Sequence, residues 1–595
     1  MKLRNLATAI ILFAAAGAGA SEITLEISGK AATRRTPPLP YRPDYAETVV
    51  PDTQKTGGTI GAALGSAAGV DVQRRGAPGA QGDISIRGSS FQQNLVLIDG
   101  MRMNDPQTAH HNLDLPLTIF DVERLDVLRG PYSSVYGPDA FAGAVNILTK
   151  SPDKDRLSAR LALGEFATWS ALVSCDRKWG KFGQKLSLEK SASGGFREGT
   201  DYKSENLFSR SSLDLPWGEL NLSLGYLDKD FGASQFYSAV LKDEREHTKT
   251  RFAGLSAGFG GEDSITLEPK AYFRRHDDRF SYIYNSKHYA NRHITGVSVG
   301  ELRMKKKLGA MGEVTAGGEY SEEKIDSSNI GGHRAVRKAV FAQYAFSPAP
   351  GVDVDAALRG DRHSSWGWQA SPGLRLGLTL SPEAKLWAMA GRAFRAPSFT
   401  ELYYKDPGNT GNTGLKPERS VSYETGLDWK PGKNLGVRAA VYRRYESNLI
   451  DWTKQVPTGP WAANNIGKVR VWGFEETLES GIGALRASLK YSYIHKKSSD
   501  AAYISKYALR YARHKTGLGL KYAMPRAAAL TLNLSAVRRA GEKGYVLADT
   551  EFSKKYGNIE ASAGVTNIFN ARYEEIPAAA APGRWFNFSL SYSFI

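Results

Sequence analysis

Cysteine is almost absent from the chain, which contains a single one, Cys175, in 595 residues. A secreted protein stabilised by disulfides would have a larger and even number. The sequence also lacks the Cys and His spacing of a zinc site. We therefore expect the fold to be stabilised by secondary structure and packing, and we predict no intrinsic cofactor.

Long apolar runs are missing as well. Beyond the first 20 residues no run of about 18 apolar residues occurs, so no membrane-spanning helix is predicted. No long segment has a helical period, and no repeat recurs at a fixed blade period, which argues against a β-propeller or a solenoid. The mean hydropathy of −0.38 still permits a membrane β-barrel, because barrel strands alternate apolar and polar residues.

Catalytic motifs are scarce too. The chain has no HExxH metalloprotease motif. The pattern G-x-S-x-G occurs twice, at Gly254–Gly258 and Gly296–Gly300, but both copies lie in strand-like stretches with no helix after them. A nucleophile elbow needs a strand, a turn and a helix. We therefore do not expect an enzyme.

The first 20 residues have the pattern of a secretory signal peptide. Lys2 and Arg4 precede an apolar run, Leu6–Ala16, which ends in the small residues Gly17–Ala20. The net charge of the chain is +17. Solvated loops account for this charge as well as an anionic partner does, and for an exported protein lipopolysaccharide phosphates or an anionic ligand are better partners than nucleic acid.

A proline-rich segment, residues 21–45, follows the signal peptide. Pro37, Pro38, Pro40 and Pro43 favour an extended linker. Just before them, EITLEIS alternates apolar and polar residues, as a short strand does. A strand on a flexible tether is suited to joining the sheet edge of another protein. The strand-like segment comprises Glu22, Ile23, Thr24, Leu25, Glu26, Ile27 and Ser28.

Glycine-rich turns and short strands characterise the next hundred residues. Gly57–Val72 predicts a short helix that ends near Gly69 and leads into a strand. Strands alternate with turns from Asp83 to about Lys150, and AVNILTK closes this compact domain. Its glycines do not indicate a phosphate cradle, because the Gly-Lys-Ser/Thr ending is absent and no amphipathic helix follows.

The pattern changes near Arg156 and then persists to the end of the chain. Apolar and polar residues alternate in segment after segment, most regularly in Phe586–Phe594. Such alternation suits strands with lipid on one side and a polar lumen on the other. The remaining 440 residues would supply roughly 22 strands at about 20 residues each. A barrel of that width needs a plug, and the N-terminal domain offers one.

The chain contains, in this order, the motifs Ile86–Gly88, Leu95–Asp105, Val122–Lys150, Arg392–Tyr404, Gly411–Gly426, Asn464–Glu475 and Val565–Glu575. Together they give the chain a resemblance to the TonB-dependent outer-membrane receptors. The length and LVLIDG…RGP are most similar to the vitamin B12 (cobalamin) receptors, and next to the catecholate siderophore receptors. The resemblance implies an all-β membrane protein: a signal peptide (1–20), a TonB box and linker (21–45), a plug (46–152) and a 22-stranded antiparallel barrel (153–595).

The resemblance also implies a mechanism and a location. A monomer in the outer membrane of a Gram-negative bacterium, surrounded by lipopolysaccharide, would bind a scarce, bulky solute such as a corrinoid or an iron siderophore. The ligand would then carry cobalt or iron. TonB, energised through ExbB and ExbD, would pair with a periplasmic TonB box, for which Glu22–Ser28 is the matching segment. A passive porin or adhesin-like barrel is the alternative, but such a barrel would lack the plug and the box.

Three loops of the plug are expected to face outward and to meet the ligand. Arg75 is suited to a phosphate or a carboxylate, and the amides to hydrogen bonds with a ligand. Solvated loops are the competing interpretation. Adjacent histidines in an extended loop point to opposite sides, so we predict no metal site. The predicted ligand-binding residues are Arg75, Gln92, Gln93, Gln107, His110, His111 and Asn112.

Charged residues of the plug are expected to pair with charges on the barrel wall, because a charge inside the barrel needs a partner or water. The resemblance implies such pairs at Arg87, Glu123, Arg124 and Arg129. Acidic residues at Asp228, Asp230, Asp243 and Glu244 are too few to predict a calcium site.

Overall fold

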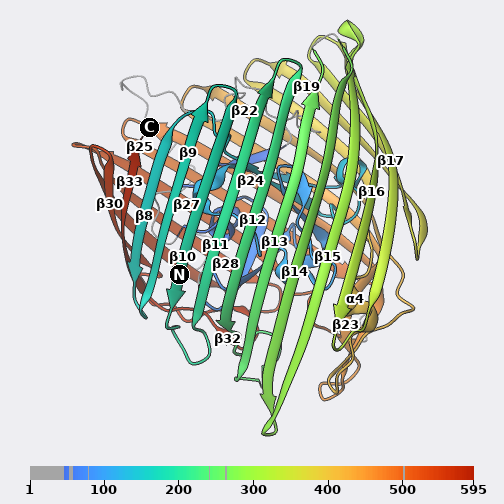
Figure 1. The fold of residues 1–595 in the computed structure, drawn as a ribbon, viewed down its shortest axis with the longest axis vertical. Helices are drawn as coiled ribbons and strands as arrows, with labels where there is room; N and C mark the ends of the chain where they lie inside the picture. The colour runs from blue at the N-terminus through green and yellow to red at the C-terminus, as the bar shows by residue number, and fades with distance from the viewer. Residues whose placement is uncertain are drawn as a thin grey trace.

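The computed structural model describes residues 46–52, 58–77, 79–239, 241–261, 264–499 and 503–594. The predicted signal peptide (1–20), the TonB box and linker (21–45) and the C-terminal Ile595 lie outside these residues. The described chain forms a closed antiparallel barrel of 22 long strands around a small N-terminal plug (Figure 1). The predicted fold class is confirmed.

The barrel closes where its last strand pairs with its first. Phe594 of β33 is opposite Leu157 of β8. The long strands are β8 (Arg156–Gly164), β9 (Thr168–Trp179), β10 (Phe182–Ser193), β11 (Tyr202–Leu215), β12 (Gly218–Gly232), β13 (Glu244–Phe259), β14 (Thr266–Tyr284), β15 (Lys287–Lys307), β16 (Glu313–Ser327), β17 (His333–Ala349), β18 (Val352–His363), β19 (Gly367–Ser381), β20 (Ala384–Arg395), β22 (Glu418–Gly432), β23 (Leu435–Lys454), β24 (Trp461–Ile482), β25 (Leu485–Ser498), β27 (Ala512–Met524), β28 (Ala528–Arg539), β29 (Tyr545–Tyr556), β30 (Ile559–Thr566) and β33 (Trp585–Phe594).

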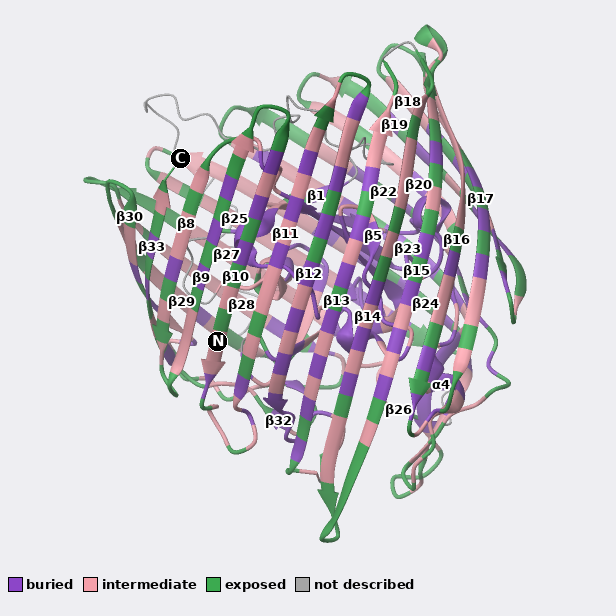
Figure 2. Ribbon diagram, in the orientation of Figure 1, coloured by how far each residue is buried: buried purple, intermediate pink, exposed green. Residues whose placement is uncertain are grey.

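Alternation along the strands separates a lipid-facing surface from the lumen. Figure 2 shows exposed and buried residues alternating in bands along the strands. In β33 the exposed residues are apolar: Phe586 is 51% exposed and Phe594 53%, whereas Ser589 between them is fully buried. Apolar side chains on the outer face suit a hydrocarbon environment, and polar side chains line the lumen. No helix among the described residues is long and apolar enough to cross a membrane.

Connections at the two ends of the barrel differ in length. At one end the hairpins close tightly, as between β11 and β12. The other end, called the long-loop end below, lies at the bottom of Figure 1, where α4 and β32 are labelled. Its connections contain the short elements α4 (Phe399–Tyr403), β21 (Asn409–Thr410), β26 (Ile504–Ser505), β31 (Glu574–Ile576) and β32 (Ala579–Ala580), and η6 (Gly309–Met311) belongs to the opposite end.

The plug lies inside the barrel, where Figure 1 draws it in blue. Its five-stranded sheet has the order β1-β6-β7-β4-β5, and β2 pairs with β3 in a separate hairpin. The predicted short helix and strand are present as α2 and β2. The plug elements are β1 (Ala46–Val49), α2 (Ile60–Gly65), β2 (Val70–Arg75), β3 (Gln81–Ile86), η3 (Phe91–Gln93), β4 (Asn94–Ile98), β5 (Met101–Arg102), η4 (Ala109–His111), η5 (Ile119–Asp121), β6 (Val122–Arg129), α3 (Ser133–Tyr136) and β7 (Gly143–Thr149).

The predicted closing strand of the plug is β7, which pairs with β4 and β6. Gly143 begins this strand, and a Cβ atom there would lie 2.5 Å from the carbonyl oxygen of Leu128. The core beneath the sheet includes Ile84, Val127 and Ile147, and Phe252 of the barrel wall packs against it. The plug and the barrel therefore share one apolar core in addition to their polar contacts.

Candidate functional site

The predicted histidine pair lies in η4, near the long-loop end of the barrel. His110 stacks on Phe91 at 4.1 Å between ring centroids, and Tyr507 is 5.9 Å away. Its Nδ1 is 2.8 Å from Oδ1 of Asp83. Burial lowers the pKa of His110 to about 4, although Asp83 opposes the change. His110 is therefore neutral at pH 7 and donates to Asp83.

Arg75 is buried rather than solvated. Its Nη2 donates to Oδ2 of Asp83 at 2.7 Å, and its Nη1 donates to the carbonyl oxygen of Phe236 in the β12–β13 connection. Burial alone would raise the pKa of Asp83, but Arg75 and His110 lower it to about 2. The guanidinium thus connects the β2–β3 hairpin to a loop of the barrel, and in this arrangement it is not open to a ligand.

The predicted amide residues differ in their surroundings. Gln92 is half-buried and lines a small cavity of about 60 Å³ between the plug and the barrel, together with Asp105 and Arg337. Gln93 donates to Glu418 of β22 at 3.0 Å, and Gln107 donates to Asp278 of β14 at 2.8 Å. Oδ1 of Asn112 accepts from the backbone N–H of Asp105 at 3.0 Å. Of these four residues, only Gln92 lines this cavity.

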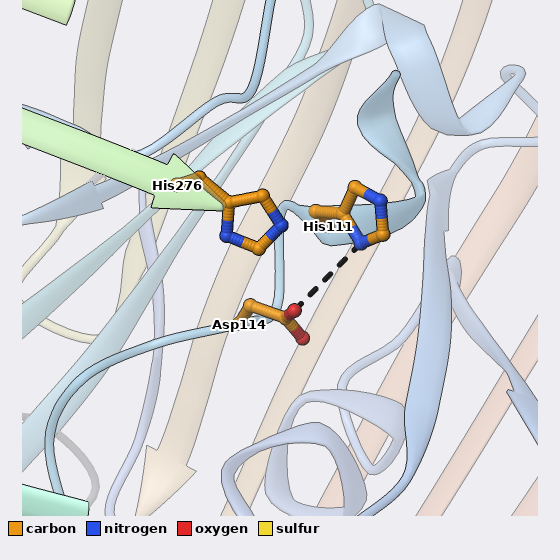
Figure 3. Close-up of side chains that lie close together, drawn as sticks. All are labelled: His111, Asp114 and His276. Atoms are coloured by element: carbon orange, nitrogen blue, oxygen red, sulfur yellow. Dashed lines mark ion pairs between the residues drawn. The ribbon is translucent and has the colours of Figure 1, made fainter. Parts of the chain in front are cut away.

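His111 points into a different group of side chains from His110. Its Nδ1 is 3.7 Å from Oδ2 of Asp114, and its Nε2 is 3.6 Å from both Oε1 of Glu246 and Oδ2 of Asp278. The ring lies 4.6 Å from that of His276 on β14, and Figure 3 shows these two rings and Asp114 converging. Burial alone would lower the pKa of His111, but the surrounding carboxylates raise it well above the ordinary value.

The histidines sit in a 3₁₀ turn rather than in the extended loop expected from the sequence. Their rings nevertheless diverge, because one contacts Asp83 of the plug hairpin and the other contacts the wall formed by β13 and β14. The two histidines therefore do not converge on one point.

Arg87 joins the plug to two barrel strands. Its Nε and Nη2 donate to Oε1 and Oε2 of Glu475 on β24, each at 3.0 Å, and its Nη1 contacts Glu424 on β22. Its guanidinium also lies 4.1 Å from the ring centroid of Tyr442. All three charged groups are at most 3% exposed. The contact is therefore a buried and geometrically specific one.

The other predicted ion-pair residues behave differently from one another. Arg129 donates to Glu47 of β1 at 2.8 Å and lies 3.5 Å from Glu475 of the barrel. Arg124 instead pairs with its neighbour Glu123 at 3.4 Å and with Asp126 at 3.2 Å. Both pairs lie within β6, and Arg124 and Asp126, which are two residues apart, share one face of that strand. These pairs differ from the expected contact with the barrel wall.

Comparison with known proteins decides the family. The model of the TonB-dependent receptor-like β-barrel matches residues 132–594, and that of the TonB-dependent receptor plug domain matches residues 50–144. The chain belongs to the TonB-dependent receptors. Membership places it in the outer membrane of a Gram-negative bacterium and implies coupling to TonB and a small-molecule ligand. The family consists of receptors and transporters rather than enzymes.

The relatives of the receptor are named after different substrates. The vitamin B12 transporter BtuB of Vibrio vulnificus is 26% identical over 554 residues, which are 85% of this chain and 84% of the relative. The siderophore receptor PirA of Acinetobacter baumannii has a TM-score of 0.75 at 16% identity and covers 92% and 98% of the two chains. The copper transporter OprC has a TM-score of 0.78 with the same identity and coverage. These two structures share the fold of the receptor.

Several contacts that hold the receptor's plug were not anticipated from the sequence. Barrel cations meet plug carboxylates in several described pairs, whose partners are more than 60 residues apart along the chain. No local pattern could indicate such pairs, because each depends on the register of the barrel. They include Lys185–Asp121 at 3.7 Å, Arg210–Asp99 at 3.4 Å, Lys229–Asp114 at 2.5 Å, Arg274–Asp105 at 2.6 Å, Lys490–Glu47 at 2.9 Å, Lys521–Asp52 at 3.6 Å and Arg539–Asp71 at 2.5 Å.

Proposed function

We propose that this receptor takes up a bulky metal chelate, with a corrinoid as the first candidate and an iron siderophore as the second. The corrinoid is favoured because the B12 transporter matches over most of both chains. We further propose that the receptor acts as a monomer among lipopolysaccharide molecules, that ExbB and ExbD energise its TonB, and that it catalyses no reaction. Residues 46–152 would act as the plug and residues 153–595 as the barrel.

The observation that supports energised rather than passive transport is the seating of the plug. Arg87 holds two carboxylates of the barrel wall in a buried site, and breaking such a pair leaves an uncompensated buried charge. A bulky solute therefore cannot pass while the plug is seated. The energy for moving the plug has to come from outside the barrel, which is the task of TonB.

Among the predicted residues, Gln92 is the one that we propose to contact the ligand directly. It lines the cavity between the plug and the barrel. The remaining predicted residues, Arg75, Gln93, Gln107, His110, His111 and Asn112, would act through the groups they hold. For example, Arg75 positions the backbone at Phe236 in a barrel loop. A bound ligand that moves this loop would disturb the Arg75–Asp83–His110 contacts and so reach the plug.

A binding and uptake experiment tests the proposal. The purified receptor is titrated with cyanocobalamin and with a panel of ferric siderophores, and cells expressing it are tested for uptake of the bound compound with and without an uncoupler. We expect tight binding of one compound class and uptake that the uncoupler abolishes. Uptake that persists without the proton gradient would contradict energised transport, and binding of neither class would contradict the substrate proposal.

A matched pair of variants tests the site. Gln92→Ala should weaken binding, because this side chain lines the cavity. Arg334→Ala is the control, because Arg334 is an exposed cation on β17 that pairs with Glu322. Equal affinities of the two variants would contradict a role of Gln92.

A further inference from the structure

Three side chains at the plug–barrel interface turn polar atoms that lack a hydrogen-bond partner in the described chain toward one another. They are His111 and Asp114 of the plug and His276 of β14, and one ligand atom from each lies within 4.8 Å of the others (Figure 3). Among the described residues, Nδ1 of His111, Oδ2 of Asp114 and Nε2 of His276 have no hydrogen-bond partner. All three residues are at most 3% exposed. Unsatisfied polar atoms this deeply buried are costly.

The opposite polar atom of each residue already has a neighbour that fixes the side chain. Nδ1 of His276 is 2.9 Å from Oγ1 of Thr250, and Oδ1 of Asp114 accepts from Lys229 at 2.5 Å. Nε2 of His111 faces Glu246 and Asp278. Metal-binding histidines characteristically donate their second ring N–H to a carboxylate or another oxygen. His276 therefore has the outer contact of a metal ligand. His111 would gain the same contact if one of its two carboxylates, now 3.6 Å from Nε2, moved closer.

The spacing of the inner atoms fits an ion better than a hydrogen bond. Nδ1 of His111 and Oδ2 of Asp114 are 3.7 Å apart, beyond the usual range of about 2.7–3.2 Å for a hydrogen bond. A tetrahedral zinc ion with bonds of about 2.0–2.2 Å holds its ligand atoms about 3.3–3.6 Å apart. The three ligand atoms lie within 4.8 Å of one another, so inward movements of these side chains would bring them to that spacing.

We propose that His111, Asp114 and His276 bind one divalent transition-metal ion, preferentially zinc, which joins the plug to the barrel wall. Two imidazoles and one carboxylate are a suitable ligand set for zinc, and a water molecule would fill the fourth position. The ion is a resident of the interface and not the transported solute, because its ligands are buried and come from both parts of the receptor. This proposal goes beyond uptake and does not depend on the identity of the ligand.

Charge favours a cation at this place. The carboxylates of Asp114, Glu246 and Asp278 surround His111, and Lys229 contacts only the first of them. A protonated His111 would also supply positive charge, but it would leave Nε2 of His276 without a partner. A metal ion satisfies both rings at once.

A second possible ion position, on the other side of His111, is less suitable. There the ligands would be His111, Glu246 and Asp278. Oδ2 of Asp278, the oxygen that faces His111, already accepts from Gln107 at 2.8 Å. These carboxylates are therefore assigned to orienting His111, and the ion to its Nδ1 side.

Cobalt(II) is the probe, because its visible absorption reports coordination by nitrogen and oxygen ligands. The full-length receptor is refolded in detergent with cobalt(II) present, so that the ion can enter before the interface closes, and the metal content is measured after gel filtration. We expect one ion per chain, displaced by zinc, and a higher unfolding temperature with the ion than without. Less than half an equivalent in the wild-type receptor would overturn the proposal.

Variants assign the ligands. His276→Gln and the isosteric Asp114→Asn should each weaken cobalt binding at least tenfold and abolish the gain in unfolding temperature. His293→Gln is the matched control, because His293 is a buried lumen histidine whose Nδ1 contacts Ser327 at 2.7 Å. It should bind cobalt as the wild type does. Wild-type binding by both ligand variants, or equal losses in all three variants, would overturn the assignment.

Discussion

Arg87 of the plug and Glu475 of barrel strand β24 form a bidentate ion pair, in which two nitrogens of one guanidinium meet two oxygens of one carboxylate at 3.0 Å. Such fork-to-fork geometry gives directional specificity as well as attraction. Arg87 itself lies in a tight turn with a φ of 52°, followed by Gly88 at 67°. The turn therefore directs the guanidinium toward the wall.

Replacing Arg87 with glutamine should loosen the plug. The change leaves Glu424 and Glu475 buried without their cation, and the loss of one partner of a buried pair costs about 3–5 kcal/mol. Denaturant unfolding in detergent should show a less stable plug, and planar-bilayer recordings should show more frequent channel openings. Arg124→Gln, whose pairs stay within β6, is the control and should change neither. Equal behaviour of the two variants would contradict the role assigned to Arg87.

Glu47 should make plug stability depend on pH in the acid range. Burial would raise its pKa, but Lys490 and Arg129 lower it from 4.5 to about 2. A lowered carboxyl pKa stabilises the folded state above pH 4.5, and this contribution is lost as the pH falls through about 2. The shift corresponds to about 3 kcal/mol at neutral pH.

The measurement is the free energy of unfolding at pH 7 and at pH 3, in the wild type and in Glu47→Gln. We expect the wild type to be the more stable protein at pH 7, and its advantage to shrink toward pH 3. A difference that stays constant over this range would show that the Glu47 carboxylate does not contribute in the way proposed.

Deleting Glu22–Ser28 should abolish uptake while leaving ligand binding intact. The segment lies outside the described residues, and its role as the TonB box stays a prediction. TonB is expected to pair with this segment as an added strand, whereas no predicted ligand-binding residue lies in it. The ligand affinity of the purified variant should therefore match that of the wild type. Energised uptake at the normal rate after the deletion would rule out this assignment.

Phe594→Asp should impair insertion of the barrel. Phe594 is 53% exposed on the outer face and is opposite Leu157 at the closing seam. Moving the phenyl ring out of lipid costs about 2 kcal/mol, and a carboxylate on the lipid face adds to this. Folded receptor in outer-membrane fractions is the measurement. Deletion of Ile595 is the comparison and should be tolerated, and normal levels of the Asp variant would refute the prediction.

The barrel could be predicted because its signal is local. In β33 each lipid-facing residue is two positions from the next, so Phe586–Phe594 reveals both the strand and its outer face. The plug strand β7 was predictable for a similar reason. The cluster of His111, Asp114 and His276 could not be predicted, because its contacts join distant positions. His276 is 165 residues from His111, and the register of β14 brings the two side chains together.

Burial of the predicted ligand residues has the same cause. Arg75 and Gln93 are polar residues in loop-like segments, which the sequence indicates as solvated or ligand-facing. Their partners, the Phe236 carbonyl and the Glu418 carboxylate, come from the barrel. Polarity alone does not distinguish a residue that meets solvent from one that meets a charged wall, so the contacts of these residues could not be predicted from the sequence.

The distribution of charge on the plug fixes its rotational orientation in the barrel. Toward β10, β11, β12 and β14 the plug presents carboxylates to lysines and arginines of the wall. Toward β22 and β24 it presents Arg87 and Arg129 to glutamates. Half a turn about the barrel axis would set like charges against each other, which is strongly unfavourable. The plug is therefore keyed to one angular position in the barrel, as a key is to its lock, by charge rather than by shape alone.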